Sequence, residues 1–195
     1  MHIFSDEILG TDCGVDEAGR GPWAGPVVAA AVILPKDFSI KKIQDSKKLS
    51  KKVRDTLFDE ITANADFGIG YGTVLEIDKY NILQATFLAM RRAIANLKTA
   101  PYRALIDGNH IPFGLPCIAE SIVKGDSKVA SIAAASIIAK VTRDRLMKDL
   151  AILYPGFGWE KNFGYGVKHH QEALKALGVT PEHRRSFKPI HNMLC

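Results

Sequence analysis

An unbroken apolar run, residues 27–34, constrains the fold of this chain more than any other feature. Pro26 and Pro35 close the run at both ends. Its Val, Ile and Ala side chains do not alternate with polar residues, which is typical of a β-strand buried on both faces. The run is also far too short to cross a bilayer. The sequence therefore predicts a sheet with an interior strand covered on both sides, and no membrane span.

The segments around this run predict further strands. Asp12 to Asp16 is expected to form the preceding strand, and the glycines within 17–22 allow a tight connection, so the two strands are expected to form a hairpin. Phe67 to Leu75 predicts a third strand. The short apolar segments Ala104 to Asp107 and Ala119 to Val123 predict two more.

Two helices are indicated by different signals. Thr73 and Glu76 have the spacing of a capping box, which opens a helix that is expected to end before Pro101. An apolar stripe at steps of three and four predicts the face of that helix that covers the sheet, and it comprises Leu83, Phe87, Met90, Ile94 and Leu97. The Ala- and Ile-rich segment from about Ser127 to Leu153 predicts the second helix.

The order of these elements predicts the fold class, α/β with a sheet of mixed direction flanked by helices. A length of 195 residues, of which 47% are hydrophobic, fits one domain with its own core. No internal repeat or linker divides the chain. We therefore expect a single domain over 1–195, in which residues from about 160 to 195 form a small C-terminal extension.

Charge and cysteine content indicate which class of partner and which cellular compartment to expect. A net charge of +5 and a pI near 9.1 favour a polyanionic partner without requiring one. Cys13, Cys117 and Cys195 are odd in number and lack CxxC spacing, which argues against a disulfide scaffold and against a zinc site. The N-terminal residues do not resemble a signal peptide. The expected location is the reducing cytoplasm.

Candidate catalytic residues are the carboxylates at the ends of predicted elements, namely Asp16, Glu17, Asp107 and Asp126. Strand ends of one sheet can bring such groups together. Adjacent side chains on a regular strand point to opposite faces, so Asp16 and Glu17 require a turn or a bulge. A plain interpretation also exists, because Asp126 fits a helix cap equally well and Asp16 fits a turn. Asp107 has no helix to cap, which favours function there.

A metal ion would explain the clustering of these carboxylates. Carboxylates close together repel one another and raise their pKa values unless a cation neutralises them. Oxygen ligands without Cys or His favour Mg²⁺ or Mn²⁺. Two such ions, about 4 Å apart, can align a water with the leaving oxygen of a phosphodiester. The sequence therefore predicts phosphoryl hydrolysis, with two ions during catalysis.

Two Asp-Ser-Lys triplets indicate phosphate binding. One occupies 45–47 within the basic stretch 36–54, and the other occupies 126–128. Tight polar turns of this kind can present hydroxyl and ammonium groups to a phosphate. Because a basic run is usually a solvated surface, only Ser46 and Lys47 are substrate-binding candidates within the stretch.

Several short motifs, spread over nearly the whole chain, share their order and spacing with one known family. They are Gly14–Pro22, Asp45–Ser50, Asn81–Thr86, Ile106–Asn109, Lys124–Ser127, Ala134–Asp144 and His183–Phe187. In these motifs the chain resembles bacterial ribonuclease HII. The resemblance implies an RNase H-like fold with a C-terminal helical extension. It also implies an endonuclease that acts on RNA–DNA hybrids and 5′ to ribonucleotides in duplex DNA, leaving 5′-phosphate and 3′-hydroxyl ends.

The resemblance also implies residue roles. The metal-binding catalytic set would be Asp16, Glu17, Asp107 and Asp126. Gly19, Arg20 and Gly21 would contact the 2′-hydroxyl and the flanking phosphate, and a 2′-hydroxyl contact is what distinguishes RNA from DNA. Tyr165 would pack on the sugar at the RNA-to-DNA junction. Without the resemblance, the Gly-Arg-Gly loop is a plain tight turn and Tyr165 a half-buried aromatic residue.

Two positions depart from the family pattern near Tyr165. Phe163 stands where the family usually has Lys, and Val167 stands where Thr is common. These departures argue against a phosphate contact in that loop. Trp23 also replaces a smaller apolar residue, which is expected to change only local packing.

Three alternatives remain. Ribonuclease HIII carries an extra N-terminal domain, for which the early position of Asp16 leaves no room. An integrase- or transposase-like nuclease would also use clustered carboxylates to bind metal ions, but this alternative does not explain the Gly-Arg-Gly loop. A non-catalytic nucleic-acid-binding module needs only the positive charge. For the enzyme that resembles ribonuclease HII, a monomer without an obligate protein partner is expected.

Overall fold

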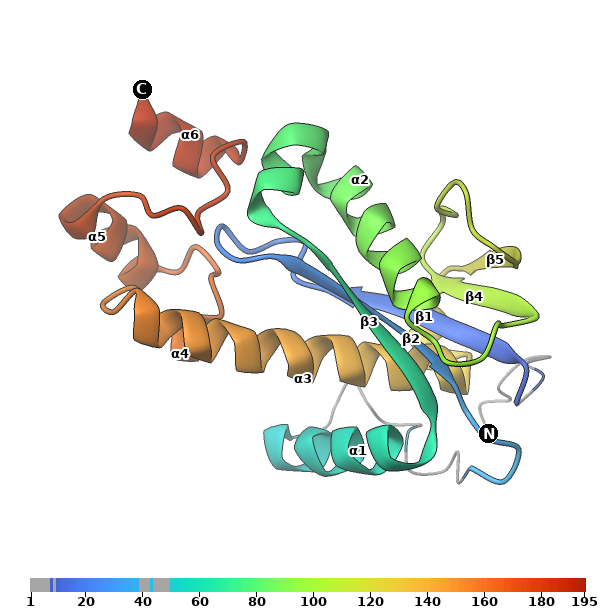
Figure 1. The fold of residues 1–195 in the computed structure, drawn as a ribbon. Coiled ribbons are helices and arrows are strands. Elements are labelled where there is room, and N and C mark those ends of the chain that lie inside the picture. The colour runs from blue at the N-terminus through green and yellow to red at the C-terminus, as the bar shows by residue number, and fades with distance from the viewer. Residues whose placement is uncertain (1–7, 9, 39–42, 44–49) are drawn as a thin grey trace.

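The protein is built on one five-stranded sheet, with strand order β3-β2-β1-β4-β5 (Figure 1). The computed structural model describes residue 8 and residues 10–38, 43 and 50–195. The strands are β1 (Asp12–Ala18), β2 (Val27–Ile33), β3 (Asp66–Gly72), β4 (Arg103–Asp107) and β5 (Ile118–Ile122). Strands β1, β2 and β3 pair antiparallel, whereas β1, β4 and β5 pair parallel. The mixed sheet and the β1–β2 hairpin are therefore confirmed.

Helices cover both faces of this sheet (Figure 1). Helix α2 (Val74–Ala95) lies on one face, and α3 (Ala130–Leu153) lies on the other with α1 (Lys51–Asn64) packed beside it. Every residue of β2 is buried, as the apolar run predicted. The sequence did not predict α1, whose hydrophobic side chains are fewer than those of the other long helices.

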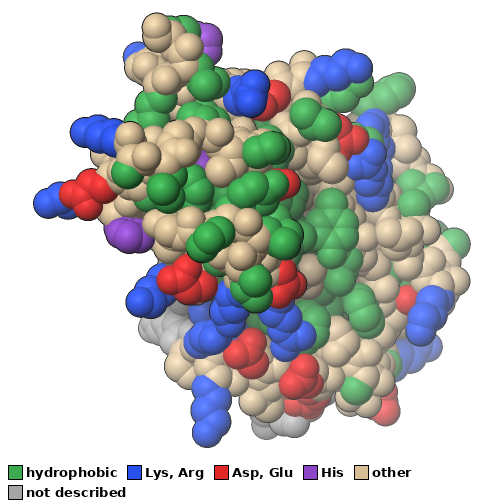
Figure 2. All heavy atoms as spheres, turned by 60° about the vertical axis from the view of Figure 1, so that its left-hand side comes forward, with side chains coloured by type: hydrophobic (Ala, Val, Ile, Leu, Met, Phe, Trp, Pro, Cys, Tyr) green, Lys and Arg blue, Asp and Glu red, His purple; other side chains and the backbone are tan. Residues whose placement is uncertain are grey.

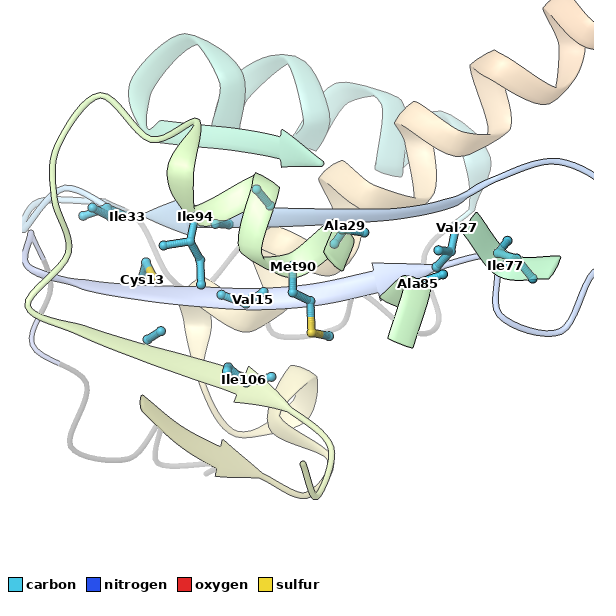
Figure 3. Close-up of a cluster of buried hydrophobic side chains, with 14 residues drawn as sticks. Cys13, Val15, Val27, Ala29, Ile33, Ile77, Ala85, Met90, Ile94 and Ile106 are labelled. Carbon is cyan, nitrogen blue, oxygen red and sulfur yellow. The ribbon is translucent and has the colours of Figure 1, made fainter. Parts of the chain in front are cut away.

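The core under α2 is formed by alternate residues of the central strands (Figure 3). Val15, Ala29 and Ile106 point from three neighbouring strands toward Met90 and Ile94 of the helix. The residues between them on the same strands point to the α3 face, because side chains alternate along a strand. Each central strand is therefore buried on two sides by two different helices.

Glycines on β3 bring α2 unusually close to the sheet. A Cβ atom added at Gly68, Gly70 or Gly72 would collide with backbone oxygens of α2. The small residues Ala85, Ala89 and Ala93 form this part of the helix, and all three are fully buried. The predicted stripe was therefore incomplete: its members Met90 and Ile94 are buried, whereas the alanines that face β3 were missed because Ala carries little hydrophobic signal.

This close contact predicts a large cost for a single methyl group at Gly70. Gly70→Ala should lower the free energy of unfolding by about 3 kcal/mol, because the helix must shift away from the sheet. Chemical denaturation followed by circular dichroism measures the loss. Gly21→Ala is the matched control, since its added Cβ meets only Tyr165 Cε1 at 3.5 Å. Equal stabilities for the two variants would contradict the proposed packing.

Three element boundaries differ from the prediction by two residues or more. β3 ends at Gly72 rather than at residue 75, because Thr73 is the N-cap of α2 and forms the predicted capping box with Glu76. Helix α3 begins at Ala130, after a short 3₁₀ turn, η3 (Gly125–Ser127). β1 continues to Ala18 instead of ending at residue 16.

The C-terminal segment is helical, as expected, and consists of α4 (Trp159–Asn162), α5 (Lys168–Leu177) and α6 (Lys188–Leu194). It lies beyond the end of the sheet, next to the last turns of α3 (Figure 1). A separate hydrophobic cluster joins it to the rest of the protein through Met147 of α3 and Ala24 of the β1–β2 connection. Across the described residues, no helix has the length and hydropathy that a membrane span requires.

Candidate active site

Two of the predicted carboxylates lie side by side at the carboxyl ends of β1 and β4. These strands are parallel, and Val15 pairs with Ile106 at the end of their ladder. Asp16 directly follows Val15 on β1, and Asp107 directly follows Ile106 on β4. An electrostatic interaction between the two carboxylates accompanies this register, and Asp107 raises the pKa of Asp16.

Both aspartates belong to the α3 face of the sheet. Gly14, two residues before Asp16, packs against the backbone of α3 at Ile132. Leu105, two residues before Asp107, packs in a small cluster with the same Ile132. Because side chains alternate along each strand, Asp16 and Asp107 point to this face as well.

Asp16 is held in an environment that disfavours its charge. Its side chain is almost fully buried, at 6% exposure. Burial raises the pKa of Asp16 well above its ordinary value, and the neighbouring Glu17 and Asp107 raise it further. Its Oδ1 accepts a hydrogen bond from the Glu17 amide at 2.7 Å, and the Ser136 hydroxyl of α3 also bonds to the carboxylate. These bonds fix the side chain without neutralising it.

Glu17 reaches the site from a regular strand. Its pairing with Ala29 directly follows the pairing of Asp16 with Ala30, so the ladder has no bulge here and neither residue lies in the turn. The expectation of a turn or bulge was therefore wrong. Glu17 Oε1 accepts from Arg20 Nη1 at 3.3 Å, yet burial outweighs this ion pair and raises the pKa of Glu17, which also interacts with Asp107.

Asp126 lies on the turn that Asp107 holds. Asp107 Oδ1 accepts a 2.6 Å hydrogen bond from the amide of Gly125, the residue immediately before Asp126. Asp126 itself lies within η3, and Val129 rather than Asp126 is the N-cap residue of α3. The interpretation of Asp126 as the N-cap residue of that helix was therefore wrong. The hydrogen bond joins the third and fourth predicted carboxylates through one turn of backbone.

A cavity of about 260 Å³ opens beside these carboxylates. It is lined by Glu17, Ala18, Gly19, Ser136, Lys140, Arg143 and Tyr165. The structure thus brings a predicted carboxylate, the predicted glycine loop and the predicted tyrosine to one place. Gly21 belongs to the same neighbourhood, because a Cβ added to it would lie 3.5 Å from Tyr165 Cε1. Ser46 and Lys47 lie outside the described residues.

Two buried arginines that the sequence analysis did not single out hold the glycine loop. Arg184 donates to the carbonyl oxygens of Gly19 at 2.6 Å, Arg20 at 2.9 Å and Gly25 at 2.9 Å. Arg143 donates to Ala24 and Pro26, next in the loop, at 3.0 Å each. Both guanidinium groups are almost fully buried.

Only glycine fits position 19 of this loop, because of its backbone conformation and because Arg143 leaves no space for a side chain. Its φ of +98° is a backbone conformation that L side chains rarely adopt, and a Cβ there would overlap the Arg143 side chain. Burial and the nearby Arg143 lower the pKa of Arg184 to about 9, and burial lowers the pKa of Arg143 to about 10. Both residues occur in motifs that carried the family resemblance, which was the available signal for them.

A buried pair of histidines fixes the backbone of Tyr165. His170 Nε2 lies 3.0 Å from His183 Nε2 and accepts from Trp159 Nε1 at 3.2 Å. The amide of Thr180 donates to His183 Nδ1, so His183 donates through Nε2 and His170 donates through Nδ1 to the Tyr165 carbonyl at 2.9 Å. Burial and the neighbouring ring lower the pKa of His183 to about 4, so the pair stays neutral.

The departures from the family pattern have local explanations. Phe163 lies in the left-handed conformation, its ring lies under Lys140 at 4.8 Å, and its carbonyl accepts from Arg143. Val167 is the N-cap of α5 and forms no side-chain cap bond. Trp23 packs against Gly166, next to Tyr165. Phe163 therefore serves packing, while Val167 leaves the start of α5 without a side-chain cap.

Comparison with known proteins gives the family. The family model described as Ribonuclease HII matches residues 13–190, which is most of the chain. The chain belongs to the ribonuclease HII family. It is therefore an enzyme with ribonuclease H activity, as the resemblance implied. The curated relatives of this family member include Ribonuclease HII of Jannaschia sp. (strain CCS1), 57% identical over 189 residues that cover 97% of this chain and 95% of the relative.

Solved structures agree with the ribonuclease HII assignment. Ribonuclease H2 from Pyrococcus horikoshii OT3 is similar with a TM-score of 0.78 and 29% identity, covering 94% of this chain and 96% of that one. Bst-RNase HIII, solved in complex with Mn²⁺, has a TM-score of 0.76 at 19% identity and covers 94% of this chain and 69% of that one. The second likeness shows only the shared fold.

The carboxylates of this ribonuclease HII family member fit a hard divalent cation by their chemistry. Among the residues that the structure describes, no three His, Cys, Asp or Glu side chains stand close enough to form a ready metal cage. However, Asp16, Glu17 and Asp107 supply only oxygen donors, and Asp107 disfavours the negative charges of both Asp16 and Glu17. A cation relieves that repulsion, and oxygen donors suit Mg²⁺ or Mn²⁺.

The burial of Asp16 predicts a stability effect that depends on pH and metal. Because its pKa is raised in the folded state, the charged form is destabilising above the ordinary value of 3.8. In EDTA at neutral pH, Asp16→Asn should therefore raise Tm by about 2–4 °C, the shift that roughly 1 kcal/mol produces in a chain of this size. The gain should vanish as the pH falls to about 3.8.

Excess Mg²⁺ provides the complementary test of this prediction. A cation that binds only the folded state raises Tm. The Tm of wild type should rise more in Mg²⁺ than the Tm of Asp16→Asn. The difference between the two Tm values should therefore shrink or change sign. Differential scanning fluorimetry follows both proteins. A lower Tm for Asp16→Asn in EDTA would show that the carboxylate stabilises the metal-free fold, contrary to the prediction.

Proposed function

We propose that this protein hydrolyses the RNA strand of RNA–DNA hybrids and cuts 5′ to ribonucleotides embedded in duplex DNA. The products would carry 5′-phosphate and 3′-hydroxyl ends. One observation carries the proposal: Glu17, which interacts with both Asp16 and Asp107, lines a cavity together with Gly19 and Tyr165. Carboxylates suited to phosphoryl chemistry thus adjoin a loop suited to recognising one ribose.

The glycine loop would select the ribonucleotide. Gly19 and Arg20 direct their carbonyl oxygens to Arg184, so the loop has a fixed shape before any substrate binds. A fixed loop loses little conformational entropy on binding. In this arrangement Gly19, Arg20 and Gly21 would contact the 2′-hydroxyl and the adjacent phosphate, and Tyr165 would pack on the neighbouring sugar.

The carboxylates Asp16, Glu17, Asp107 and Asp126 would hold the divalent ions. When bound, Mg²⁺ or Mn²⁺ supplies Lewis-acid stabilisation for the charge that develops on the phosphate oxygens, and two ions would take part in catalysis. Asp107 Oδ1 accepts a hydrogen bond from the Gly125 amide, so Oδ2 is the oxygen that would bind an ion. Glu17 is oriented by Arg20 at the mouth of the cavity.

The remaining parts of the proposal concern setting and extent. The whole chain 1–195 would act as one catalytic domain, as a monomer in the cytoplasm. Its partners would be RNA–DNA hybrid and ribonucleotide-containing duplex DNA, without an obligate protein partner. Ser46 and Lys47 would bind a phosphate of the substrate.

The direct test uses a DNA duplex with one embedded ribonucleotide and an all-DNA duplex of the same sequence. Each is incubated with Mg²⁺, Mn²⁺ or EDTA, and the products are mapped by denaturing electrophoresis against markers with defined ends. We expect a metal-dependent cut on the 5′ side of the ribonucleotide and none in the all-DNA duplex. Equal cutting of both duplexes would indicate a general nuclease, and binding without cutting would indicate a binding module.

A further inference from the structure

A second cleft, separate from the catalytic cavity, lies between α1 and α3. Its volume is about 220 Å³, and its lining residues are Lys51, Arg54, Asp55, Val141, Asp144, Arg145 and Lys148. In Figure 2, Lys and Arg side chains gather with acidic ones on the lower part of the molecule, at the height of these two helices in Figure 1. The cleft is therefore polar and mostly basic, unlike an apolar ligand pocket.

The charges of this cleft do not balance. Its two aspartates face four cationic side chains, and Asp144 is already bound to Lys140 at 2.7 Å. Arg145 contacts Asp59 at 3.7 Å, at the rim. Lys148, in contrast, lies near another cation, Lys51, and the anions near Lys148 are Asp55 and the already paired Asp144. The cleft keeps an excess of positive charge around this lysine pair.

A pair of ammonium groups in contact is unfavourable unless an anion bridges them. Each repels the other, and this repulsion lowers the pKa of Lys148. Lys51 is also the first residue of α1, a helix of 14 residues with no acidic side chain in its first turn. The positive end of the helix dipole therefore adds to the same field. A tetrahedral oxyanion such as phosphate can accept from both ammonium groups at once.

The position of the cleft connects it to the catalytic cavity. Ser136, Lys140, Asp144 and Lys148 follow one another at steps of four, which forms a continuous ridge along α3. Ser136 and Lys140 line the catalytic cavity, and Asp144 and Lys148 line the basic cleft. The distance from Ser136 to Lys148 along the helix axis is about 18 Å. Phosphates along one strand are spaced about 3.4 Å apart along the duplex axis, so for a duplex whose axis follows α3 this distance corresponds to about five nucleotides.

We propose that the cleft between α1 and α3, with Lys51 and Lys148 at its centre, binds a backbone phosphate of the substrate duplex about five nucleotides from the cut. This inference rests on the proposed function, since it requires that a duplex occupies the catalytic cavity. The cleft adds affinity without reading sequence, because its contacts are to phosphate alone. It sets the length of duplex that the enzyme needs for full affinity.

The experiment compares duplexes of different length with wild type and the double variant Lys51→Gln/Lys148→Gln. One duplex has about ten base pairs, one helical turn, on each side of a single ribonucleotide. Two others are cut back on one side to about three base pairs, which reach roughly 10 Å. Fluorescence anisotropy in EDTA gives Kd without cleavage. Lys98→Gln, at the opposite end of the sheet near Asp66, is a control that removes one positive charge far from the cleft.

The double variant should bind the long duplex roughly five-fold more weakly, as expected for two exposed charge contacts. Its slope of log K against log salt should fall by about one per phosphate lost. One of the shortened duplexes should bind wild type and double variant equally, because it no longer reaches the cleft. Lys98→Gln should match wild type throughout. The double variant should also keep the wild-type Tm, since both side chains lie at the surface.

Other outcomes overturn the proposal in distinguishable ways. Equal losses on all three duplexes would mean that the lysines act only through net charge. Unchanged duplex affinity, together with a phosphate-induced rise in Tm that the double variant lacks, would mean that the cleft takes a free anion rather than the duplex. If wild type cuts at the ribonucleotide while the variants bind like wild type, the cleft proposal fails and the proposed function stands. If wild type neither cuts nor prefers the ribonucleotide duplex, the proposed function itself fails.

Discussion

Asp107→Asn should lower kcat at least about a hundred-fold, because even the loss of a residue that only supports a metal ligand costs 10–100-fold. The substitution removes the negative charge beside Asp16 but keeps the oxygen that accepts from the Gly125 amide at 2.6 Å. The turn that carries Asp126 should therefore stay in place. Single-turnover cleavage of the embedded-ribonucleotide duplex in Mg²⁺ measures the loss, and Tm in EDTA should not fall.

Glu120→Gln is the control for Asp107→Asn. Glu120 lies on the neighbouring strand β5 with an exposed side chain, and it contacts Arg103 at 3.3 Å. Its replacement removes the same charge from the same sheet without touching the catalytic cavity, so kcat should stay near wild type. Full activity of Asp107→Asn would remove this residue from the catalytic set. Loss of activity in both variants would instead point to the charge of the sheet as a whole.

Arg184→Met should lower the free energy of unfolding by about 3 kcal/mol and raise KM about ten-fold or more. The arginine donates to Gly19, Arg20 and Gly25, and Met fills similar space but donates to none of them. One buried and two partly buried carbonyl oxygens would lose this donor, and the loop proposed to bind the ribonucleotide would lose its fixed shape. Chemical denaturation and steady-state cleavage at several substrate concentrations measure the two effects.

The neighbouring arginine serves as the control for Arg184→Met. Arg185 is exposed, and its backbone amide rather than its side chain bonds to Asp78. Arg185→Met should therefore leave stability near wild type. Arg184→Lys should recover less than half of the loss, because an ammonium group cannot reach three carbonyls in the way that a planar guanidinium does. An Arg184→Met protein with normal stability and KM would exclude the proposed support of the loop.

Several parts of the fold were readable from local sequence because they depend on neighbours along the chain. The buried strand β2 follows from an apolar run, and the start of α2 follows from the capping box of Thr73 and Glu76. Asp107 stood out because a carboxylate directly follows a short buried strand. Such signals lie within a few residues of one another, so propensity and periodicity detect them.

Helix α1 and the alanine face of α2 were not readable in the same way. The hydrophobic side chains of α1 are few, and only Leu57 and Ile61 are buried. Ala85, Ala89 and Ala93 matter because the glycines of β3 admit the helix backbone. Small residues carry almost no periodic signal, although they decide how closely a helix and a sheet approach. Packing between distant segments therefore determined these elements.

The sequence by itself determined the strand pattern, the candidate carboxylates and the family, because these reside in short motifs. Only the tertiary structure decided that Asp16 and Asp107 are neighbours, since a parallel ladder between β1 and β4 joins segments far apart in the chain. It alone placed Arg184 under Gly19, across 165 residues. The physical reason is that a buried charge is tolerated only where the fold supplies its partners, and no local pattern encodes partners that arrive from the other end of the chain.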